Sequence, residues 1–166
     1  NGDMGKALSI LKNEMVGSYC FTFISDDNSV YAARDPKGFR PMVLGHKKSD
    51  DTYIVTSESA AITAVGATLQ RDVVPGELIK LSKTGLETEL FSTDSSRAHC
   101  SFEFTYFAHP SSNMEGHNIY VSRKKIGQFM AKKFPIKDAD LVIPVPDSAR
   151  PAALGYAQEL GVSFDE

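Results

Sequence analysis

Apolar residues recur every three or four positions near the start of the chain, and this spacing predicts an amphipathic helix over residues 3–15. The positions that form the pattern are Met4, Leu8, Leu11 and Met15. Gly17 follows and ends the pattern, because glycine is a poor helix former. We expect this helix to pack against a core and to have no chemical role.

Short stretches rich in β-branched and aromatic residues then predict a series of strands. They cover residues 19–24, 29–33, 42–44, 53–56, 78–81 and 86–91. Turn-forming residues at 26–28 and 83–85 join two pairs of these strands into hairpins. Among the strands, the small residues 60–67 predict a helix with Ser57 or Ser59 as its N-cap.

The polar segment 92–98 is the best linker candidate in the chain. Beyond it, residues 102–107 alternate aromatic with other side chains, which predicts a strand. A helix is then expected from Ser122, as its N-cap, to about Lys133. Its apolar face would be formed by Ile126, Phe129 and Met130. Its basic residues, expected to lie mostly in solvent, are Arg123, Lys124, Lys125, Lys132 and Lys133.

The most informative stretch of the chain is 140–161. An apolar run at 141–145 predicts one buried strand, and a polar turn at 146–150 separates it from a helix over 151–160. Proline suits the first turn of this helix, and Gly161 suits a left-handed end. Such a turn directs free N–H groups and the positive end of the helix dipole at one spot, which favours an anion such as phosphate. The alternative is a turn that binds nothing.

Composition and charge narrow the classes of function. The chain has 166 residues, 42% of them hydrophobic, and no window of about 18 apolar residues, so we expect a globular protein with no membrane partner. A net charge of −3 argues against nucleic acid as a partner. The two cysteines, Cys20 and Cys100, make no disulfide framework and are typical of the cytoplasm. The chain starts at Asn1 without a signal-peptide pattern, and we expect it to be an internal piece of a longer protein.

The loop at 34–41, RDPKGFRP, allows two interpretations. Arg34, Asp35 and Arg40 could clamp a substrate, or the arginines could bond to carboxylates and backbone carbonyls and have only a structural role. We favour the structural interpretation, because loops rich in proline and glycine need side-chain hydrogen bonds to hold their shape.

Several blocks of the sequence resemble the amidophosphoribosyltransferases (glutamine phosphoribosylpyrophosphate amidotransferases), in the order and at the approximate spacing of that family. The blocks are ARDPKGFRPMVLG at 33–45, TSESAAI at 56–62 with RDVVPGELIKL at 71–81, CSFEFTYFAHPSSNMEGHNIYVSRKKIG at 100–127 and VIPVPDSARPAALGYAQELG at 142–161. They cover nearly all of the chain, so the match is stronger than any single motif. His109 and Ser111 depart from the pattern, since the family usually has arginine and aspartate at these positions.

The resemblance implies an α+β / α/β chain. Part of an N-terminal-nucleophile (class II glutamine amidotransferase) sandwich would occupy residues 1–91, with a linker at 92–99. The start of a type I phosphoribosyltransferase, a Rossmann-like domain, would occupy 100–166. In such a sandwich the attacking cysteine is the first residue of the mature chain, whose α-amino group serves as the base. Cys20 is internal and is expected to be a small buried residue on a strand, so the nucleophile is expected upstream of Asn1.

The resemblance also implies an activity. The parent enzyme would transfer ammonia from glutamine to PRPP, giving 5-phosphoribosylamine, glutamate and diphosphate, the first committed step of purine biosynthesis. A cytoplasmic homo-oligomer (often a tetramer) with purine nucleotides as feedback inhibitors is implied, whereas the 166 residues alone are expected to be inactive. Two alternatives remain open: a non-catalytic paralogue that senses nucleotides or binds a partner, which His109 and Ser111 favour, and a transferase that uses free ammonia.

The loop that the resemblance assigns to the PRPP diphosphate consists of Pro146, Asp147, Ser148, Ala149 and Arg150. Ser148 matches the position associated with the Mg²⁺ of PRPP, and a hydroxyl oxygen is a suitable ligand for that hard cation. The alternative role of Ser148 is as the N-cap of the following helix. Arg150 could add a positive charge to the phosphate site.

Cys100 matches a position that, in a subset of the family, supplies one of four thiolates to a 4Fe–4S cluster. Other members keep a cysteine there without a cluster. The resemblance therefore makes a 4Fe–4S cluster a possible cofactor of the whole protein, besides Mg²⁺, and this chain offers no second ligand beside Cys100.

Overall fold

The computed structural model describes residues 2–94 and 96–166. The chain divides into two compact units, residues 1–100 and 101–166. Among the described residues, no helix has the length and apolar character that spanning a bilayer requires. The assignment of residues 1–91 and 100–166 to two functional domains stays a prediction.

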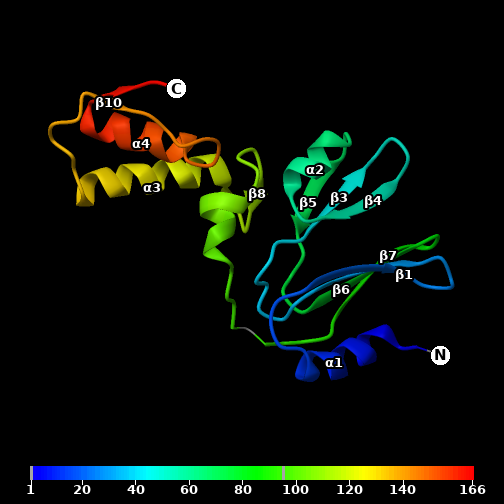
Figure 1. The fold of residues 1–166 in the computed structure, drawn as a ribbon. Helices are drawn as coiled ribbons and strands as arrows, with labels where there is room; N and C mark the ends of the chain where they lie inside the picture. Colours follow the sequence, from blue (N-terminus) through cyan, green and yellow to red (C-terminus); the bar gives the residue numbers. More distant parts are fainter. Residues whose placement is uncertain (1, 95) are drawn as a thin grey trace. The chain divides into compact units, whose positions relative to one another are not determined.

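The first unit contains two helices and seven strands among its described residues (Figure 1). In chain order they are α1 (Met4–Glu14), β1 (Cys20–Ile24), β2 (Val30–Arg34), β3 (Val43–Lys47), β4 (Thr52–Thr56), α2 (Ser59–Ala64), β5 (Thr68–Asp72), β6 (Glu77–Ser82) and β7 (Gly85–Leu90). Strands β1-β2-β6-β7 form a four-stranded antiparallel sheet, and β4-β3-β5 form a three-stranded one. The predicted first helix and both predicted hairpins are confirmed.

Alternate residues of β2 belong to two different parts of the core. Ala33 packs in a cluster with Leu8 of α1, whereas Ala32 packs in a cluster with Leu44 of β3. Because successive side chains of a strand point to opposite faces, α1 covers one face of the four-stranded sheet and the three-stranded sheet covers the other. Ile62 of α2 is fully buried and packs against β3. The layered arrangement of helix, two sheets and helix agrees with the expected sandwich.

The loop after β2 is held by a buried arginine. The Arg34 guanidinium donates from Nε to the carbonyl of Arg40 at 2.9 Å, from Nη1 to that of Val73 at 2.6 Å and from Nη2 to that of Gly38 at 3.0 Å. Asp35, also buried, accepts from the amides of Lys37 at 3.0 Å and Phe39 at 3.1 Å. The structural interpretation of this loop is confirmed.

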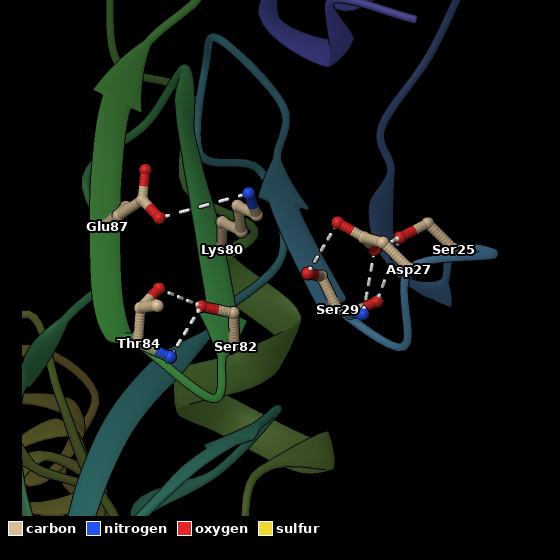
Figure 2. A network of polar contacts seen from close by, with 7 residues as sticks. All are labelled: Ser25, Asp27, Ser29, Lys80, Ser82, Thr84 and Glu87. Carbon is tan, nitrogen blue, oxygen red and sulfur yellow. Dashed lines mark hydrogen bonds and ion pairs between the residues drawn. The ribbon is translucent and has the colours of Figure 1, made fainter. Parts of the chain in front are cut away.

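The turn between β1 and β2 is organised by a carboxylate (Figure 2). Asp27 accepts from the amide of Ser29 at 2.9 Å and from the hydroxyls of Ser25 and Ser29. Asn28 adopts a positive φ of 60°, which asparagine tolerates better than most residues. The expected turn chemistry at 26–28 is therefore present.

Two expectations for the first unit are wrong in detail, and one of its strands, β5, was not predicted. Helix α2 has Glu58 at its N-cap position, with no side-chain cap bond, so neither Ser57 nor Ser59 caps it. Strand β5 lacks a clear pattern of its own and forms because it pairs with β3. Cys20 is exposed, since β1 is an edge strand of its sheet and offers this side chain little cover.

The second unit begins with a π-helical turn and contains two helices that cross each other. Its elements are η1 (Glu103–Phe107), β8 (Asn113–Met114), β9 (His117–Asn118), α3 (Ile119–Lys133), β10 (Leu141–Val142), α4 (Arg150–Leu160) and β11 (Ser163–Phe164). Helices α3 and α4 lie side by side in Figure 1, and each contributes a glycine to the crossing. A Cβ on Gly127 would lie 1.8 Å from the Ala152 carbonyl oxygen, and one on Gly155 would lie 2.1 Å from that of Lys124.

The predicted strand at 102–107 is wrong, because residues 103–107 form η1. The amide of Ala108 donates to the carbonyl of Glu103 at 3.1 Å, which closes a turn of the π type. Arg123 of α3 stabilises this turn by donating to the carbonyls of Phe104 at 2.8 Å and Ala108 at 2.8 Å. A side chain distant in sequence thus overrides the local strand pattern.

Helix α3 begins earlier than predicted and packs a different face. Asn118, not Ser122, is the N-cap, and its side chain accepts from the amide of Val121 at 3.1 Å. The buried positions are Ile119, Arg123, Gly127 and Ala131. The residues that were expected to form the packed face are exposed instead: Ile126, Phe129 and Met130. The expectation that Arg123 lies in solvent is also wrong, since its guanidinium binds η1.

The expected buried strand at 141–145 is much shorter and mostly exposed. Only β10 forms, and it pairs in parallel with β11 alone among the described strands. Leu141, Ile143 and Val145 are exposed, because a two-stranded parallel sheet leaves much of its surface uncovered. The helix predicted after it is confirmed as α4, which ends at Gly161 with a φ of 71°.

Candidate functional site

The predicted phosphate-binding turn lies where β10 leads into α4. Residues 146–149 form the turn, and the peptide bond between Pro146 and Asp147 is cis. Ala149 occupies the N-cap position with no side-chain cap bond, so the alternative role of Ser148 as the N-cap is wrong. Pro151 lies in the first turn of α4 as expected, where its missing N–H leaves no hydrogen bond unmade.

Several backbone N–H groups of this turn have no hydrogen-bond acceptor among the described residues. Within the described part of the chain, the amides of Asp147, Ser148 and Ala149 donate no hydrogen bond. The amide of Arg150 donates to the carbonyl of Asp147 at 3.3 Å, which tightens the turn. The first amides of a helix have no acceptor within the helix, so these consecutive unpaired amides form an arrangement suited to an anion.

The packing of α4 fixes the position of these amides. Because Gly127 and Gly155 carry no side chain, the backbones of α3 and α4 approach closely along their crossing. Tyr156 adds a tether, since its hydroxyl donates to the carbonyl of Phe134 at 2.8 Å and accepts from the amide of Ile136 at 3.2 Å. The N-terminus of α4 is therefore held by helix packing as well as by its own hydrogen bonds.

The positive charge of Arg150 lies next to two carboxylates. Its Nε lies 2.6 Å from Oε2 of Glu166, and its Nη2 lies 3.6 Å from Oδ1 of Asp147. The side chains of Arg150, Asp147 and Glu166 are 51%, 86% and 47% exposed. The positive charge next to the turn is thus partly balanced, and sequence reasoning had no signal for the contribution of Glu166.

The oxygen atoms near the turn fit a hard cation only in part. Ser148 is half-buried, and its hydroxyl forms no hydrogen bond with the described residues. Among these residues no group of three or more His, Cys, Asp or Glu side chains converges on a metal position. Ser148 and Asp147 can therefore supply one or two oxygen ligands, as Mg²⁺ bound through substrate phosphates requires, but not a complete protein cage.

Cys100 lies apart from this turn in sequence and has a structural environment. It is buried, and its amide donates to the carbonyl of Phe39 at 3.0 Å. Cys20 is exposed, and its thiol lies 3.8 Å and 3.7 Å from the carbonyls of Arg40 and Pro41. A 4Fe–4S cluster needs four thiolates, and the described residues gather no such set. The residues present therefore do not by themselves fit a cluster.

The two positions that depart from the family pattern contact each other. Nδ1 of His109 lies 2.8 Å from the hydroxyl oxygen of Ser111, and the amide of Ser111 donates to the same nitrogen at 3.2 Å. The amide of Ser112 donates to the carbonyl of His109 at 2.9 Å. These bonds close a local turn, which gives both residues a structural explanation.

Comparison with known sequences and structures identifies relatives over nearly the whole chain. No family model matches. Amidophosphoribosyltransferase from Mycobacterium tuberculosis is 43% identical over 150 residues, which are 90% of this chain and 28% of the relative. The Archaeoglobus fulgidus protein of that name is 42% identical over 165 residues, covering 99% of this chain and 35% of the relative. The Bacillus subtilis protein is 38% identical over 159 residues, with coverages of 96% and 32%. The chain thus spans about a third of the length of these relatives.

A solved structure described as glutamine phosphoribosylpyrophosphate (PRPP) amidotransferase from B. subtilis complexed with ADP and GMP superposes with a TM-score of 0.91. The two chains are 34% identical, and the match covers 99% of this chain and 35% of the other. Another solved structure, described as the allosteric regulatory enzyme of purine biosynthesis, gives the same values. On this agreement of sequence and fold, the chain belongs to the amidophosphoribosyltransferase family.

Proposed function

We propose that the turn at 146–150 binds the diphosphate of PRPP, and that the whole protein transfers ammonia from glutamine to this substrate. The products would be 5-phosphoribosylamine, glutamate and diphosphate. The observation that carries the proposal is the set of unpaired amides of Asp147, Ser148 and Ala149 at the N-terminus of α4. The family relationship supports it, because the B. subtilis neighbour is described as a PRPP amidotransferase.

The geometry favours the departure of diphosphate. When the bond between the ribose anomeric carbon and the diphosphate breaks, negative charge grows on the leaving group. Amides that are already fixed in place stabilise that charge without reorganising, and the dipole of α4 adds to the effect. The close crossing of α3 and α4 keeps the amides in position. Bound Mg²⁺ would neutralise part of the diphosphate charge, with Ser148 and Asp147 as the protein groups nearest to hold it.

Arg150 has a secondary role in this proposal. Its guanidinium is shared with Glu166 and Asp147, so its attraction for a phosphate is reduced. An arriving diphosphate would compete with these carboxylates for the same N–H donors. We therefore assign most of the binding to the main chain rather than to this side chain.

The remaining parts of the activity are proposals about the whole protein. Because the chain spans about a third of its relatives, we propose that the 166 residues alone have no transferase activity and that the glutaminase nucleophile is a residue outside them. Inhibition by purine nucleotides is supported by the ADP and GMP in the description of the B. subtilis neighbour. A cytoplasmic homo-tetramer and, in the whole protein, a 4Fe–4S cluster at Cys100 stay predictions.

The amide proposal is tested by removing one donor at a time. Ala149 has a φ of −79°, which proline can adopt, so Ala149→Pro deletes one N–H with little change in backbone direction. Ala149→Ser keeps the N–H and is the matched control. We expect the proline variant to bind magnesium diphosphate about tenfold more weakly by calorimetry, with the serine variant within about twofold of the parent. Equal binding by all three proteins would refute the assignment.

Ser148→Ala tests the metal role separately. Because Ser148 caps no helix, this variant should unfold at the same denaturant concentration as the parent. Its affinity for diphosphate should fall when Mg²⁺ is limiting and recover when Mg²⁺ is in excess. An affinity that does not depend on Ser148 at any Mg²⁺ concentration would remove this residue from the site.

A further inference from the structure

A short segment at the end of the first unit, residues 98–100, lies along the loop that follows β2, and we call it the strap. The amide of Ala98 donates to the carbonyl of Lys37 at 3.0 Å. The amide of Cys100 donates to the carbonyl of Phe39, also at 3.0 Å. Because the donors and the acceptors are each two residues apart and run in the same direction, the strap follows the loop in the manner of a parallel strand pair.

The histidine in the middle of the strap adds a side-chain contact. Nδ1 of His99 lies 2.9 Å from the carbonyl oxygen of Gly38, which also accepts from Nη2 of Arg34 at 3.0 Å. Gly38 has a φ of 60°, and a Cβ on it would lie 2.5 Å from Cγ of Pro75, so the loop requires glycine here. A carbonyl oxygen has two lone pairs, and this one therefore faces both the arginine of the loop and the strap.

The internal bonds of the loop prepare it for the strap. The carboxylate of Asp35 accepts from the amides of Lys37 and Phe39, and the buried guanidinium of Arg34 fixes the surrounding backbone. Because the amides of these two residues are bonded inside the loop, their carbonyls are the groups that can bond to another segment. The loop thus offers a fixed row of acceptors to the strap.

The strap ends where the second unit begins. Cys100 is the last residue of the first unit and is 7% exposed. Helical backbone begins at the next residue, Ser101, whose carbonyl accepts from the hydroxyl of Thr105 at 3.2 Å. The strap and this helical turn follow one another directly, so only the backbone torsions at Cys100 and Ser101 lie between them.

From these contacts we propose that the strap is a releasable element, and that the junction of Cys100 and Ser101 is the hinge between the two units. While the strap is bound, motion is limited to rotation at this junction, as in hinges whose motion is absorbed at the ends of elements. Ala98 is exposed, and hydrogen bonds in such segments open before those of a sheet core. Release adds three residues to the connection and lengthens it by about 10 Å when extended.

Hydrogen exchange followed by two-dimensional NMR tests whether the strap is bound in the 166-residue chain. We expect the amides of Ala98 and Cys100 to exchange about tenfold or more slowly than the amide of Thr93. Thr93 serves as the reference because its amide donates no hydrogen bond to a described residue. Exchange of all three amides at one rate would refute the strap.

A pair of variants tests whether the strap can be released on its own. Ala98→Pro removes one donor of the strap, and Ala98→Ser keeps it as the matched control. The proline variant should lose about tenfold or more of the protection at Cys100, and the serine variant should stay within about twofold of the parent. Protection of Ile79 in β6 should not change in either variant. An equal loss at Ile79 and Cys100 would overturn the proposal, because the strap would then be part of the core.

The hinge is tested by pulsed electron spin resonance between two nitroxide labels. One label is attached at the exposed Cys20 and the other at Gln158→Cys, an exposed position of α4, while Cys100 is buried. We expect the distribution of label distances to be about twofold broader in Ala98→Pro than in the parent, and unchanged in Ala98→Ser. Equal widths in all three proteins, with protection at Cys100 lost in the proline variant, would overturn the hinge.

Discussion

The two loops that contain aspartate, arginine and proline use the same residue types in opposite ways. In the loop at 34–41 the arginine is buried and donates to three carbonyls, and the aspartate accepts from two amides. In the loop at 146–150 the arginine is half-exposed beside carboxylates, and three amides have no acceptor among the described residues. The first loop satisfies its own hydrogen-bonding groups, whereas the second leaves donors for a ligand.

This difference shows that composition alone does not separate a loop whose polar groups are paired from a loop with unpaired backbone donors. The deciding property is where the backbone donors and acceptors of the loop find partners. A loop with all its groups paired internally contributes to stability, and a loop with unpaired donors at a helix N-terminus contributes to binding. Mutations in the two loops should therefore change different measured quantities.

The largest expected effect is that of Arg34→Met. The substitution leaves the carbonyls of Arg40, Val73 and Gly38 without the guanidinium donors, and we expect the free energy of unfolding of the first unit to fall by about 3–5 kcal/mol. Arg150→Met, at an exposed ion pair, should change stability by less than about 1 kcal/mol. Urea unfolding followed by NMR signals of each unit measures both. Similar losses for the two variants would contradict the contrast between the loops.

The next effect concerns the helix crossing that holds the proposed diphosphate turn. In Gly127→Ala the new Cβ would lie 1.8 Å from the carbonyl oxygen of Ala152, so α3 and α4 must separate. We expect a loss of about 1–3 kcal/mol in the second unit, measured by thermal unfolding, together with weaker diphosphate binding. Gly2→Ala is the control, since nothing lies within 4 Å of its added Cβ. A Gly127→Ala protein with parental stability would show that the crossing is not tightly packed.

A smaller, pH-dependent effect is expected at the turn that joins β1 to β2 (Figure 2). The hydrogen bonds from Ser25 and then from Ser29 lower the pKa of Asp27 from 3.8 to about 2. Because the folded pKa is below the unfolded one, the contribution of Asp27 to stability is present above about pH 4 and is lost as the pH falls towards 2. Asp27→Asn should flatten the acid limb of the stability curve. An unchanged acid limb would mean that the turn is not held by the charged carboxylate.

The smallest effect, a change in diphosphate affinity, is expected for Glu166→Gln. This variant tests how the ion pair with Glu166 limits the part of Arg150 in the proposed diphosphate turn. Removing this carboxylate frees Arg150 from its closest partner, whose distance from Nε is 2.6 Å. Diphosphate affinity should rise about twofold at low salt, and the gain should disappear in high salt because exposed charges are screened. A fall in affinity would instead show that Glu166 helps to position Arg150 for binding.

Local sequence patterns were sufficient wherever a segment carries its own boundary signals. Helix α1 has Asp3 as its N-cap and an apolar stripe, and α4 has Pro151 in its first turn and Gly161 at its end. The hairpin turns contain residues suited to their backbone conformation. In these segments the favoured local conformation and the observed one agree, so prediction from sequence succeeded.

The candidate turn was predicted by position but not in its details. The order of strand, polar turn and helix was visible in the residues, and so was the exposure of backbone donors that this order implies. The residues alone did not show that Arg150 pairs with Glu166 or that Ser148 does not cap α4. Both facts depend on where Glu166 and the first turn of α4 lie in space.

The sequence by itself determined the order of most elements, the family of the chain and the place of the turn before α4 that we propose binds an anion, since these follow from local patterns and blocks of similar sequence. Only the tertiary structure decided that residues 103–107 are helical, that α3 buries Arg123 rather than Phe129, and that Cys20 is exposed. The physical reason is that each of these outcomes depends on groups distant in the chain. Arg123 stabilises η1 by donating hydrogen bonds to the carbonyls of Phe104 and Ala108. The edge position of β1 leaves Cys20 uncovered.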